Sequence, residues 1–349
     1  MHTADTTNNN SPNRPNLVAI TMGCPVGIGP EIILRFLTKK KSVEQYLPIV
    51  VGDRGVLQRC AKELQISVDI SAWQPGDPVD VEKIQVFEPK KSEEYELQPE
   101  SLSWGVPGKE TGHAAAAYIM EAVRLITHGE LDAMVTCPIA KYAIQLAGYK
   151  FPGHTEMLAS LCDVQNFGMM MAGNRLKVSL VTIHTPLSKV AEQLDQADVR
   201  RIINLTGETL LKDFAFAKPR IAVAGFNPHA GESGLFGHEE TEIIVPAVAG
   251  SVSEKWELAG PLPPDTVFKM AFDNKFDAVV AMYHDQGLIP FKLVHFEDGV
   301  NLTMGLPIIR TSVDHGTAYD IAGKGLASDS SLEAAFFLAT QIIGNRKKT

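Results

Sequence analysis

The sequence predicts an α/β fold built around a mainly parallel sheet. Short apolar runs alternate along the chain with longer segments of helical periodicity, which is the pattern of βαβ units. The chain has 349 residues, enough for a large buried core and more typical of two lobes than of one. Its 45% hydrophobic and 21% charged residues are the composition of an ordinary globular protein.

Three strand and helix pairs are expected in the first part of the chain. A long Ala-rich helix leads into the third strand within residues 112–137, and we expect the chain to cross between lobes near this point. The expected strands lie within residues 16–21, 46–53 and 131–137, and helical segments follow them within 29–40, 54–64 and 140–148.

The same alternation continues in the second part of the chain, without an internal repeat. The helical pattern at 187–214 is the longest of this part. Strands are expected within residues 176–187, 220–231 and 276–287.

Composition also limits the class of protein. Residues 1–16 are polar and rich in Asn and Pro, so we expect a disordered tail rather than a signal peptide. No apolar run approaches the roughly 20 residues of a membrane helix, so we expect a cytoplasmic protein without membrane contact. The net charge of −9 argues against a nucleic-acid partner. The four cysteines are far apart and lack CxxC spacing, which favours reduced packing residues.

A histidine stands at or just past the end of three predicted strands: His184, His229 and His284. The carboxyl ends of parallel strands line the crevice in which open α/β sheets bind ligands, so the three imidazoles can converge there. Three His ligands with an open position suit a catalytic Zn²⁺ or a similar cation. A single histidine at a strand end is more often a hydrogen-bonded turn residue, and the repetition is what favours a metal site.

Two aspartates accompany these histidines. Asp285 follows His284 directly, and Asp265 lies in the segment GPLPPDT. Either side chain can orient a metal ligand or take a proton during catalysis. Each, considered alone, is more often a turn or helix-cap residue.

Two segments are candidates for anion binding. His154 and Thr155 follow a Pro-Gly turn and precede a helical stretch, although a simple N-cap role for the threonine fits as well. Lys292, Asn301 and Arg310 lie in apolar surroundings, where a cation needs an anionic partner. That partner is either a structural carboxylate, such as Glu297 or Asp298, or a substrate phosphate.

The glycine-rich segment GCPVGIGPE, residues 23–31, follows the first strand and opens a helix. It has neither the GxGxxG spacing of a dinucleotide-binding fold nor the lysine of a P-loop. Pro30 suits the first helical turn. The spacing predicts a tight strand-to-helix turn that lines the cleft.

Seven segments together resemble the 4-hydroxythreonine-4-phosphate dehydrogenase (PdxA) family of pyridoxal phosphate biosynthesis. They occur in the family's order and cover nearly the whole chain after the tail: GCPVGIGPE, FPGHTE, IHTPL, NPHAGE, GPLPPDT, MYHDQGLIPFK and GVNLTMGLPIIRTSVDHGTAYDIAGKG.

The resemblance implies a two-lobed α/β subunit of the isocitrate and isopropylmalate dehydrogenase type, with a cleft between the lobes. The first lobe would comprise residues 17–135 with 305–349, on the cofactor side. Residues 136–304 would form the second lobe, with the metal, substrate and dimer contacts. The family also implies a homodimer whose active sites lie at the subunit interface.

The resemblance assigns roles to individual residues. The metal ligands would be His184, His229 and His284, with His284 reaching the site of the neighbouring subunit. Contacts with NAD or NADP would come from His315, Gly316, Thr317 and Asp320. The phosphorylated substrate would be held by His154, Thr155, Lys292, Asn301 and Arg310.

One segment departs from the family pattern. The family usually carries Asp where this chain has Cys24, and a small residue where it has Val26. If that Asp contacts the cofactor or the substrate, its replacement alters affinity or substrate choice.

The activity implied by the resemblance is oxidation of 4-phosphooxy-L-threonine by NAD or NADP, with Zn²⁺, Mg²⁺ or Co²⁺ as the metal. Decarboxylation then gives 3-amino-2-oxopropyl phosphate, in pyridoxine biosynthesis. Asp265, Asp285 or metal-bound water would take the proton. Two alternatives stay open: a dehydrogenase of D-threonate or D-erythronate 4-phosphate, and a non-catalytic protein that binds a phosphorylated metabolite. Three histidines suited to a metal argue against the last.

Overall fold

The computed structural model describes residues 15–39, 46–90 and 96–348, and a single twelve-stranded sheet runs through them. All but the last two residues of the tail predicted at 1–16 lie outside these ranges, and Asn16 begins the first strand. The strands are β1 (Asn16–Thr21), β2 (Tyr46–Val51), β3 (Ile70–Ala72), β4 (Ile84–Phe87), β5 (Ala133–Thr136), β6 (Gly168–Ala172), β7 (Lys177–Leu180), β8 (Arg220–Ala224), β9 (Glu257–Leu262), β10 (Ala278–Ala281), β11 (Val300–Met304) and β12 (Arg310–Val313).

The sheet is parallel at both ends and antiparallel in the middle. Its strand order is β3-β4-β2-β1-β5-β12-β11-β6-β7-β10-β8-β9. Only the pairs β12·β11, β11·β6 and β6·β7 are antiparallel among the described strands. The prediction of a mainly parallel α/β fold is therefore confirmed, and the central hairpins are an addition that the sequence did not indicate.

Helices cover the sheet and fill the connections between strands. They are α1 (Gly29–Lys39), α2 (Arg54–Glu63), α3 (Lys109–Thr127), α4 (Lys141–Leu146), α5 (His154–Leu161), α6 (Leu187–Gln193), α7 (Gln196–Lys212), α8 (Val245–Ala249), α9 (Pro264–Phe272), α10 (His284–Val294) and α11 (Ser330–Arg346). Shorter helical turns are η1 (Pro99–Ser101), η2 (Pro228–Gly234) and η3 (Glu240–Ile244).

The helical pattern predicted at 187–214 is two helices rather than one. The chain breaks between α6 and α7 at Asp195, whose side chain accepts a hydrogen bond of 2.8 Å from the Asp198 backbone N–H. Asp195 has an extended backbone, as an N-cap residue does. The N-cap at Asp195 therefore starts a new helix, although the helical periodicity of the sequence continues through this point.

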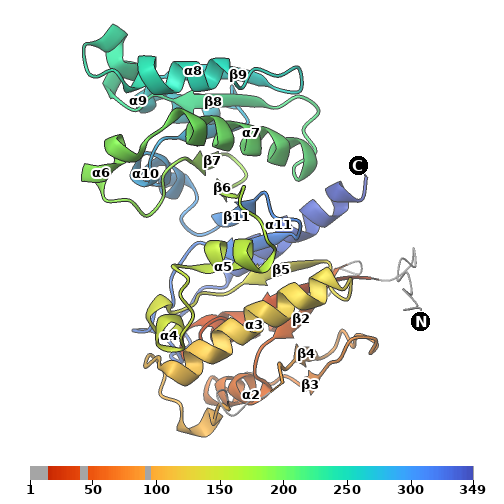
Figure 1. The fold of residues 1–349 in the computed structure, drawn as a ribbon. Helices are drawn as coiled ribbons and strands as arrows, with labels where there is room; N and C mark the ends of the chain where they lie inside the picture. Colours follow the sequence, from red (N-terminus) through yellow and green to blue (C-terminus); the bar gives the residue numbers. More distant parts are fainter. Residues whose placement is uncertain (1–14, 40–45, 91–95, 349) are drawn as a thin grey trace, which may run out of the picture.

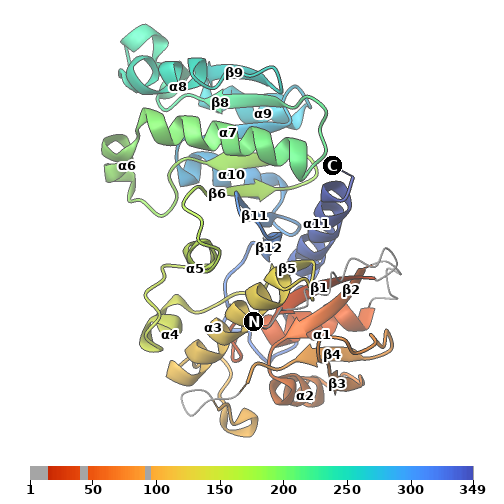
Figure 2. The ribbon, with the colours of Figure 1, turned by 45° about the vertical axis from the view of Figure 1, so that its right-hand side comes forward.

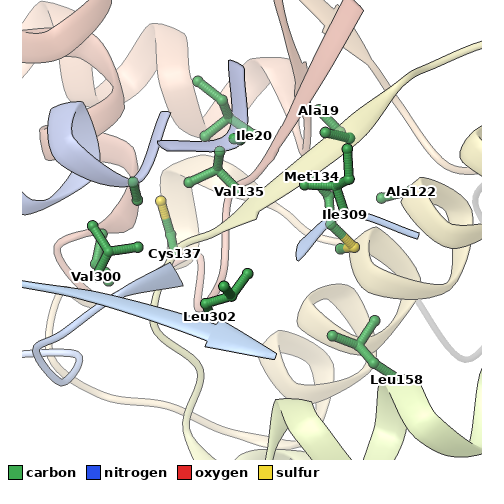
Figure 3. Packing of buried hydrophobic residues seen from close by; sticks show 14 of the residues in the cluster. Ala19, Ile20, Ala122, Met134, Val135, Cys137, Leu158, Val300, Leu302 and Ile309 are labelled. Atoms are coloured by element: carbon green, nitrogen blue, oxygen red, sulfur yellow. The ribbon is translucent and has the colours of Figure 1, made fainter. Parts of the chain in front are cut away.

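The core is built from the two faces of the sheet. Val18, Ala19 and Ile20 of β1 are fully buried, because helices cover both sides of the parallel strands. On α11, Ala335, Ala339 and neighbouring apolar residues are buried as well. Figure 3 shows residues of β1, β5 and β11 packed together with Leu158 of α5. The core is thus continuous from the first part of the sheet to its middle strands.

The ribbon has two bulky halves (Figure 1). Strands β1 to β4 lie in one half with α1, α2 and α3, and β8 and β9 lie in the other with α7, α8 and α9. From the second direction, α5 lies between the halves (Figure 2). The chain passes from the first half to the second after β5, through α4 and α5. The lobe boundaries remain a prediction, because one sheet continues through both halves.

No helix in the described part of the chain is long and apolar enough to cross a membrane.

Candidate functional site

A cavity of about 430 Å³ lies at the middle strands of the sheet. Its walls come from the segment after β5, the start of α5, strands β6, β11 and β12, helix α10 and the segment after β12. The lining residues are Pro138, Ile139, Lys141, Gly153, His154, Thr155, Glu156, Met169, His184, Lys292, Asn301, Arg310, Ser312, Val313, Asp314, His315 and Gly316. A larger cavity, of about 780 Å³ beside β2 and β4, contains none of the predicted site residues.

The cavity therefore brings together much of the predicted site. All five predicted substrate-binding residues line it, and so do His184, His315 and Gly316. The remaining predicted residues do not line it: His229, His284, Asp265, Asp285, Thr317 and Asp320.

Arg310 is the most unusual cation of the cavity. Arg310 is the first residue of β12 and is 2% exposed. Its guanidinium donates to the Thr136 hydroxyl at 2.7 and 3.1 Å and to the Thr303 hydroxyl at 3.0 Å. Burial lowers the pKa of Arg310 to about 9, so the group is still cationic at neutral pH. The Glu156 carboxylate acts on this charge through space, but the hydrogen bonds of the guanidinium go only to neutral groups among the described residues, which makes it a strong candidate for anion binding.

His154 and Thr155 stand in the first turn of α5, as their position after the Pro-Gly turn predicted. The His154 Nε2 atom is buried and has no hydrogen-bond partner among the described residues. Burial, reinforced by the charges of Arg310 and Lys141, lowers the pKa of His154 well below its usual range. A neutral imidazole with an unpartnered nitrogen is available to a ligand in the cavity.

The three predicted metal ligands do not form one cluster within a single chain. The rings of His184 and His284 have centroids 6.3 Å apart. His229 lies on η2, where residues 229–233 all have positive φ. Within the described residues, no group of three or more His, Cys, Asp or Glu side chains is placed to hold a metal ion.

A buried carboxylate binds the backbone just before the left-handed turn that carries His229. Glu240 is 3% exposed and accepts hydrogen bonds from the backbone N–H groups of Phe226 at 2.7 Å and Asn227 at 2.6 Å. Such a backbone conformation is costly for residues other than glycine and is found mainly where function requires it.

The chemistry of these histidines nevertheless fits a divalent cation. The Nδ1 atom of His229 lies 3.2 Å from the Glu232 carboxylate, and that of His284 lies 2.6 Å from Asp285. A carboxylate at Nδ1 leaves Nε2 as the ligand atom, which is the usual arrangement around metal-binding histidines. Burial lowers the pKa of His184, so its imidazole is neutral, as a ligand must be.

Asp265 and Asp285 lie on another surface. They line a mostly apolar pocket of about 500 Å³ between α9 and α10, together with Phe268, Ile289 and Leu293. In one chain, neither carboxylate lines the 430 Å³ cavity.

The glycine-rich turn was predicted to line the cleft. It does not line the cavity but contacts a residue that does. The Cys24 backbone N–H donates to the carbonyl of Pro138, a lining residue, at 2.8 Å. Gly23 has φ +70°, and a Cβ there would lie 2.3 Å from the same carbonyl. Cys24 and Val26 are buried, and the Tyr319 hydroxyl lies 3.3 Å from the Cys24 sulfur. All four cysteines are free, as predicted.

The segment predicted to bind the cofactor begins in the cavity wall and then contacts the glycine-rich turn. His315 and Gly316 line the cavity, and a Cβ on Gly316 would meet no atom within 4 Å. The Thr317 carbonyl accepts a hydrogen bond of 3.1 Å from the Ile28 backbone. The segment therefore joins the cavity to the glycine-rich turn.

Four polar residues that line the cavity are not identified by the sequence analysis: Lys141, Glu156, Ser312 and Asp314. Glu156 belongs to the FPGHTE motif and Asp314 to the segment that includes His315, so their motifs were the available signal. Asp314 is the partner of Lys292, whose Nζ lies 3.0 Å from its carboxylate. The structural carboxylate predicted for Lys292 is thus Asp314 and neither Glu297 nor Asp298.

Comparisons with known proteins identify the family of the chain. Residues 44–339 match the model of the family described as pyridoxal phosphate biosynthetic protein PdxA. A 4-hydroxythreonine-4-phosphate dehydrogenase of Desulforapulum autotrophicum is 50% identical over 94% of this chain and 95% of its own length. A D-threonate 4-phosphate dehydrogenase of Salmonella typhimurium is 43% identical over 93% and 98%. The crystal structure of 4-hydroxythreonine-4-phosphate dehydrogenase from Klebsiella pneumoniae superposes with a TM-score of 0.85, at 39% identity over 94% of this chain and 99% of that one.

Proposed function

The chain belongs to the PdxA family of pyridoxal phosphate biosynthetic proteins, and from this we propose that it oxidises and decarboxylates 4-phosphooxy-L-threonine. It is an oxidoreductase of the dehydrogenase type. The expected product is 3-amino-2-oxopropyl phosphate, and the electron acceptor is NAD or NADP.

The observation that carries this proposal is the excess of positive charge in the cavity. Lys141, Lys292 and Arg310 face it with two carboxylates, Glu156 and Asp314. One of these carboxylates already pairs with Lys292, and the guanidinium of Arg310 is held by neutral groups. A phosphate dianion is the kind of ligand that such a wall favours.

Five of the lining residues would hold the substrate. Arg310 and Lys292 bind the phosphate oxygens, and Thr155 and Asn301 donate further hydrogen bonds. The neutral imidazole of His154 offers its unpartnered Nε2 to a hydroxyl or carboxylate of the substrate. Together these contacts fix the carbon that is to be oxidised, which is a large part of catalysis in a reaction of this type.

His184, His229 and His284 would hold the divalent cation: three imidazoles suit Zn²⁺ or Co²⁺ by ligand type, and Mg²⁺ is the third candidate. When bound, such an ion polarises the substrate hydroxyl and stabilises negative charge on its oxygen. The chain's own contribution is to orient two of these imidazoles, through the carboxylates of Glu232 and Asp285 beside the Nδ1 atoms of His229 and His284. The nicotinamide cofactor would lie against His315, Gly316, Thr317 and Asp320.

A homodimer would account for three of the predicted residues that one chain leaves outside the cavity: Asp265, Asp285 and His284. Helix α10 carries exposed apolar side chains, with Ile289 69% and Leu293 87% exposed. The pocket beside them contains Asp265 and Asp285, and His284 begins the same helix. If a second subunit covers this apolar face, these three residues reach the neighbouring active site, where either aspartate can take the proton.

The dimer can be tested by placing a charge on its proposed face. Leu293→Glu is expected to give a monomer by light scattering and to lower turnover at least on the order of 100-fold, because one side of each site is lost. Val252→Glu is the matched control, since Val252 is 77% exposed and lies between α8 and β9, outside α10. A fully active Leu293→Glu monomer would refute the shared site.

Substrate choice is the second question for the purified enzyme. Formation of NADH or NADPH should be followed with 4-phosphooxy-L-threonine, D-threonate 4-phosphate and D-erythronate 4-phosphate. We expect the highest kcat/KM with 4-phosphooxy-L-threonine, in line with 50% identity to a relative of that name. The 43% identical D-threonate 4-phosphate dehydrogenase makes a phosphorylated sugar acid the second candidate. Binding of all three without turnover would favour the non-catalytic alternative.

A further inference from the structure

Asp314 is the first residue after β12 and lines the cavity. Its backbone N–H donates to the Ser331 hydroxyl at 3.0 Å, and that hydroxyl donates to the Gly299 carbonyl at 3.1 Å. The Asp314 side chain is only 14% exposed. The backbone at Asp314 is therefore anchored to the start of α11 and the turn before β11.

The partner of Asp314 comes from the other half of the molecule. The Lys292 ammonium, on α10, lies 3.0 Å from Asp314 Oδ2 and donates a hydrogen bond of 3.2 Å to the Asp314 backbone carbonyl. Asp314 Oδ2 is buried and accepts no well-aligned hydrogen bond within the described residues. Burial raises the pKa of Asp314, and the charge of Lys292 opposes that effect. The ammonium is thus held by the Asp314 carboxylate through an ion pair and by the Asp314 backbone carbonyl through a hydrogen bond.

This ion pair differs from a surface salt bridge because it restrains a lysine side chain that lines the cavity. Lys292 has a flexible four-carbon chain, and its side chain is 38% exposed toward the cavity. A lysine ammonium is a point charge without the planar geometry that orients an arginine, so its position depends on its neighbours. In the absence of Asp314, a bound phosphate would draw the ammonium toward itself.

We propose that Asp314 is a positioning residue that holds the Lys292 ammonium at the place where the phosphorylated substrate needs it. The role rests on the proposed function, because it concerns the substrate of that cavity. It predicts a separation of two effects: loss of the carboxylate impairs turnover but does not weaken phosphate binding. Removing a negative charge beside the anion site should instead leave the affinity for inorganic phosphate equal or higher.

A double-mutant cycle on the full-length protein tests this proposal. Asp314→Asn is expected to lower kcat by on the order of 10- to 100-fold, because a misplaced group is costly in catalysis. Asp314→Glu, which keeps the charge, should recover part of the loss. In a Lys292→Gln background, adding Asp314→Asn should change kcat less than twofold, because the aspartate acts through the lysine.

Calorimetry with inorganic phosphate supplies the second readout. The dissociation constant of Asp314→Asn should be equal to or lower than that of the wild type, with an unchanged unfolding temperature. Asp80→Asn is the matched control, since its carboxylate pairs with Lys83 at 3.1 Å in an exposed position outside the cavity.

Two outcomes would overturn the role of Asp314. One is an additive cycle, in which Asp314→Asn is as damaging without Lys292 as with it. The other is weaker phosphate binding by Asp314→Asn. A wild-type enzyme without turnover would refute the proposed function instead, and the phosphate measurement would then decide the role of Asp314 alone.

Discussion

Replacement of Arg310 by methionine is expected to lower kcat/KM by at least about 100-fold, which corresponds to about 3 kcal/mol of lost transition-state binding. The guanidinium is buried and its hydrogen bonds go to the hydroxyls of Thr136 and Thr303 and the amide of Asn301. Of the cations that line the cavity, Arg310 is therefore the one whose burial most favours an anionic ligand. Binding of inorganic phosphate by calorimetry should fall in parallel with activity.

The fold should survive this change, because apolar replacement of a buried charge is often tolerated. Arg310→Lys keeps the charge but not the forked geometry, so we expect an intermediate loss. Arg220→Lys is the matched control: Arg220 pairs with Asp277 at 2.9 Å and does not line the cavity. Phosphate binding by Arg310→Met that equals the wild type would remove Arg310 from the anion site.

Replacement of His229 by alanine is expected to abolish both metal binding and turnover. The side chain is 63% exposed, so little core packing is lost. Glu232→Gln should weaken metal affinity by only about 10- to 100-fold, since Glu232 orients the imidazole without being a ligand itself. Metal content by mass spectrometry and affinity by calorimetry distinguish the two variants.

An exposed histidine elsewhere controls for non-specific effects. His128→Ala, at the end of α3, should leave metal content and activity unchanged. Unfolding curves of His229→Ala should match those of the wild type. If His229→Ala retains the metal with normal affinity, His229 is not a ligand.

The fold was predictable where strands are continuous apolar runs followed by helical periodicity. This is true of β1, β2, β5, β7, β8 and β10, whose residues are buried on both faces. The central strands β6, β11 and β12 escaped prediction. Of their sequences, GMMMA lacks β-branched residues, and VNLTM and RTSV contain polar residues, so they become strands because neighbouring strands bury them.

The site was predictable to the extent that motifs mark it. Arg310, His154 and Lys292 were identified from isolated cations and a helix start in the sequence. The pairing of Lys292 with Asp314 could not be predicted, because 22 residues and the turn between β11 and β12 separate them. The left-handed turn of His229 was not predicted either, since no spacing in NPHAGE marks consecutive residues with positive φ.

The most direct test of the proposed chemistry is the product balance of the purified enzyme with 4-phosphooxy-L-threonine. NADH or NADPH and CO₂ should form in equal amounts, cease after treatment with a chelator, and return when Zn²⁺, Mg²⁺ or Co²⁺ is added. Equal formation of both products by the metal-stripped enzyme would contradict the metal-dependent mechanism. Absence of both products from the metal-loaded, phosphate-binding enzyme would contradict the proposed reaction.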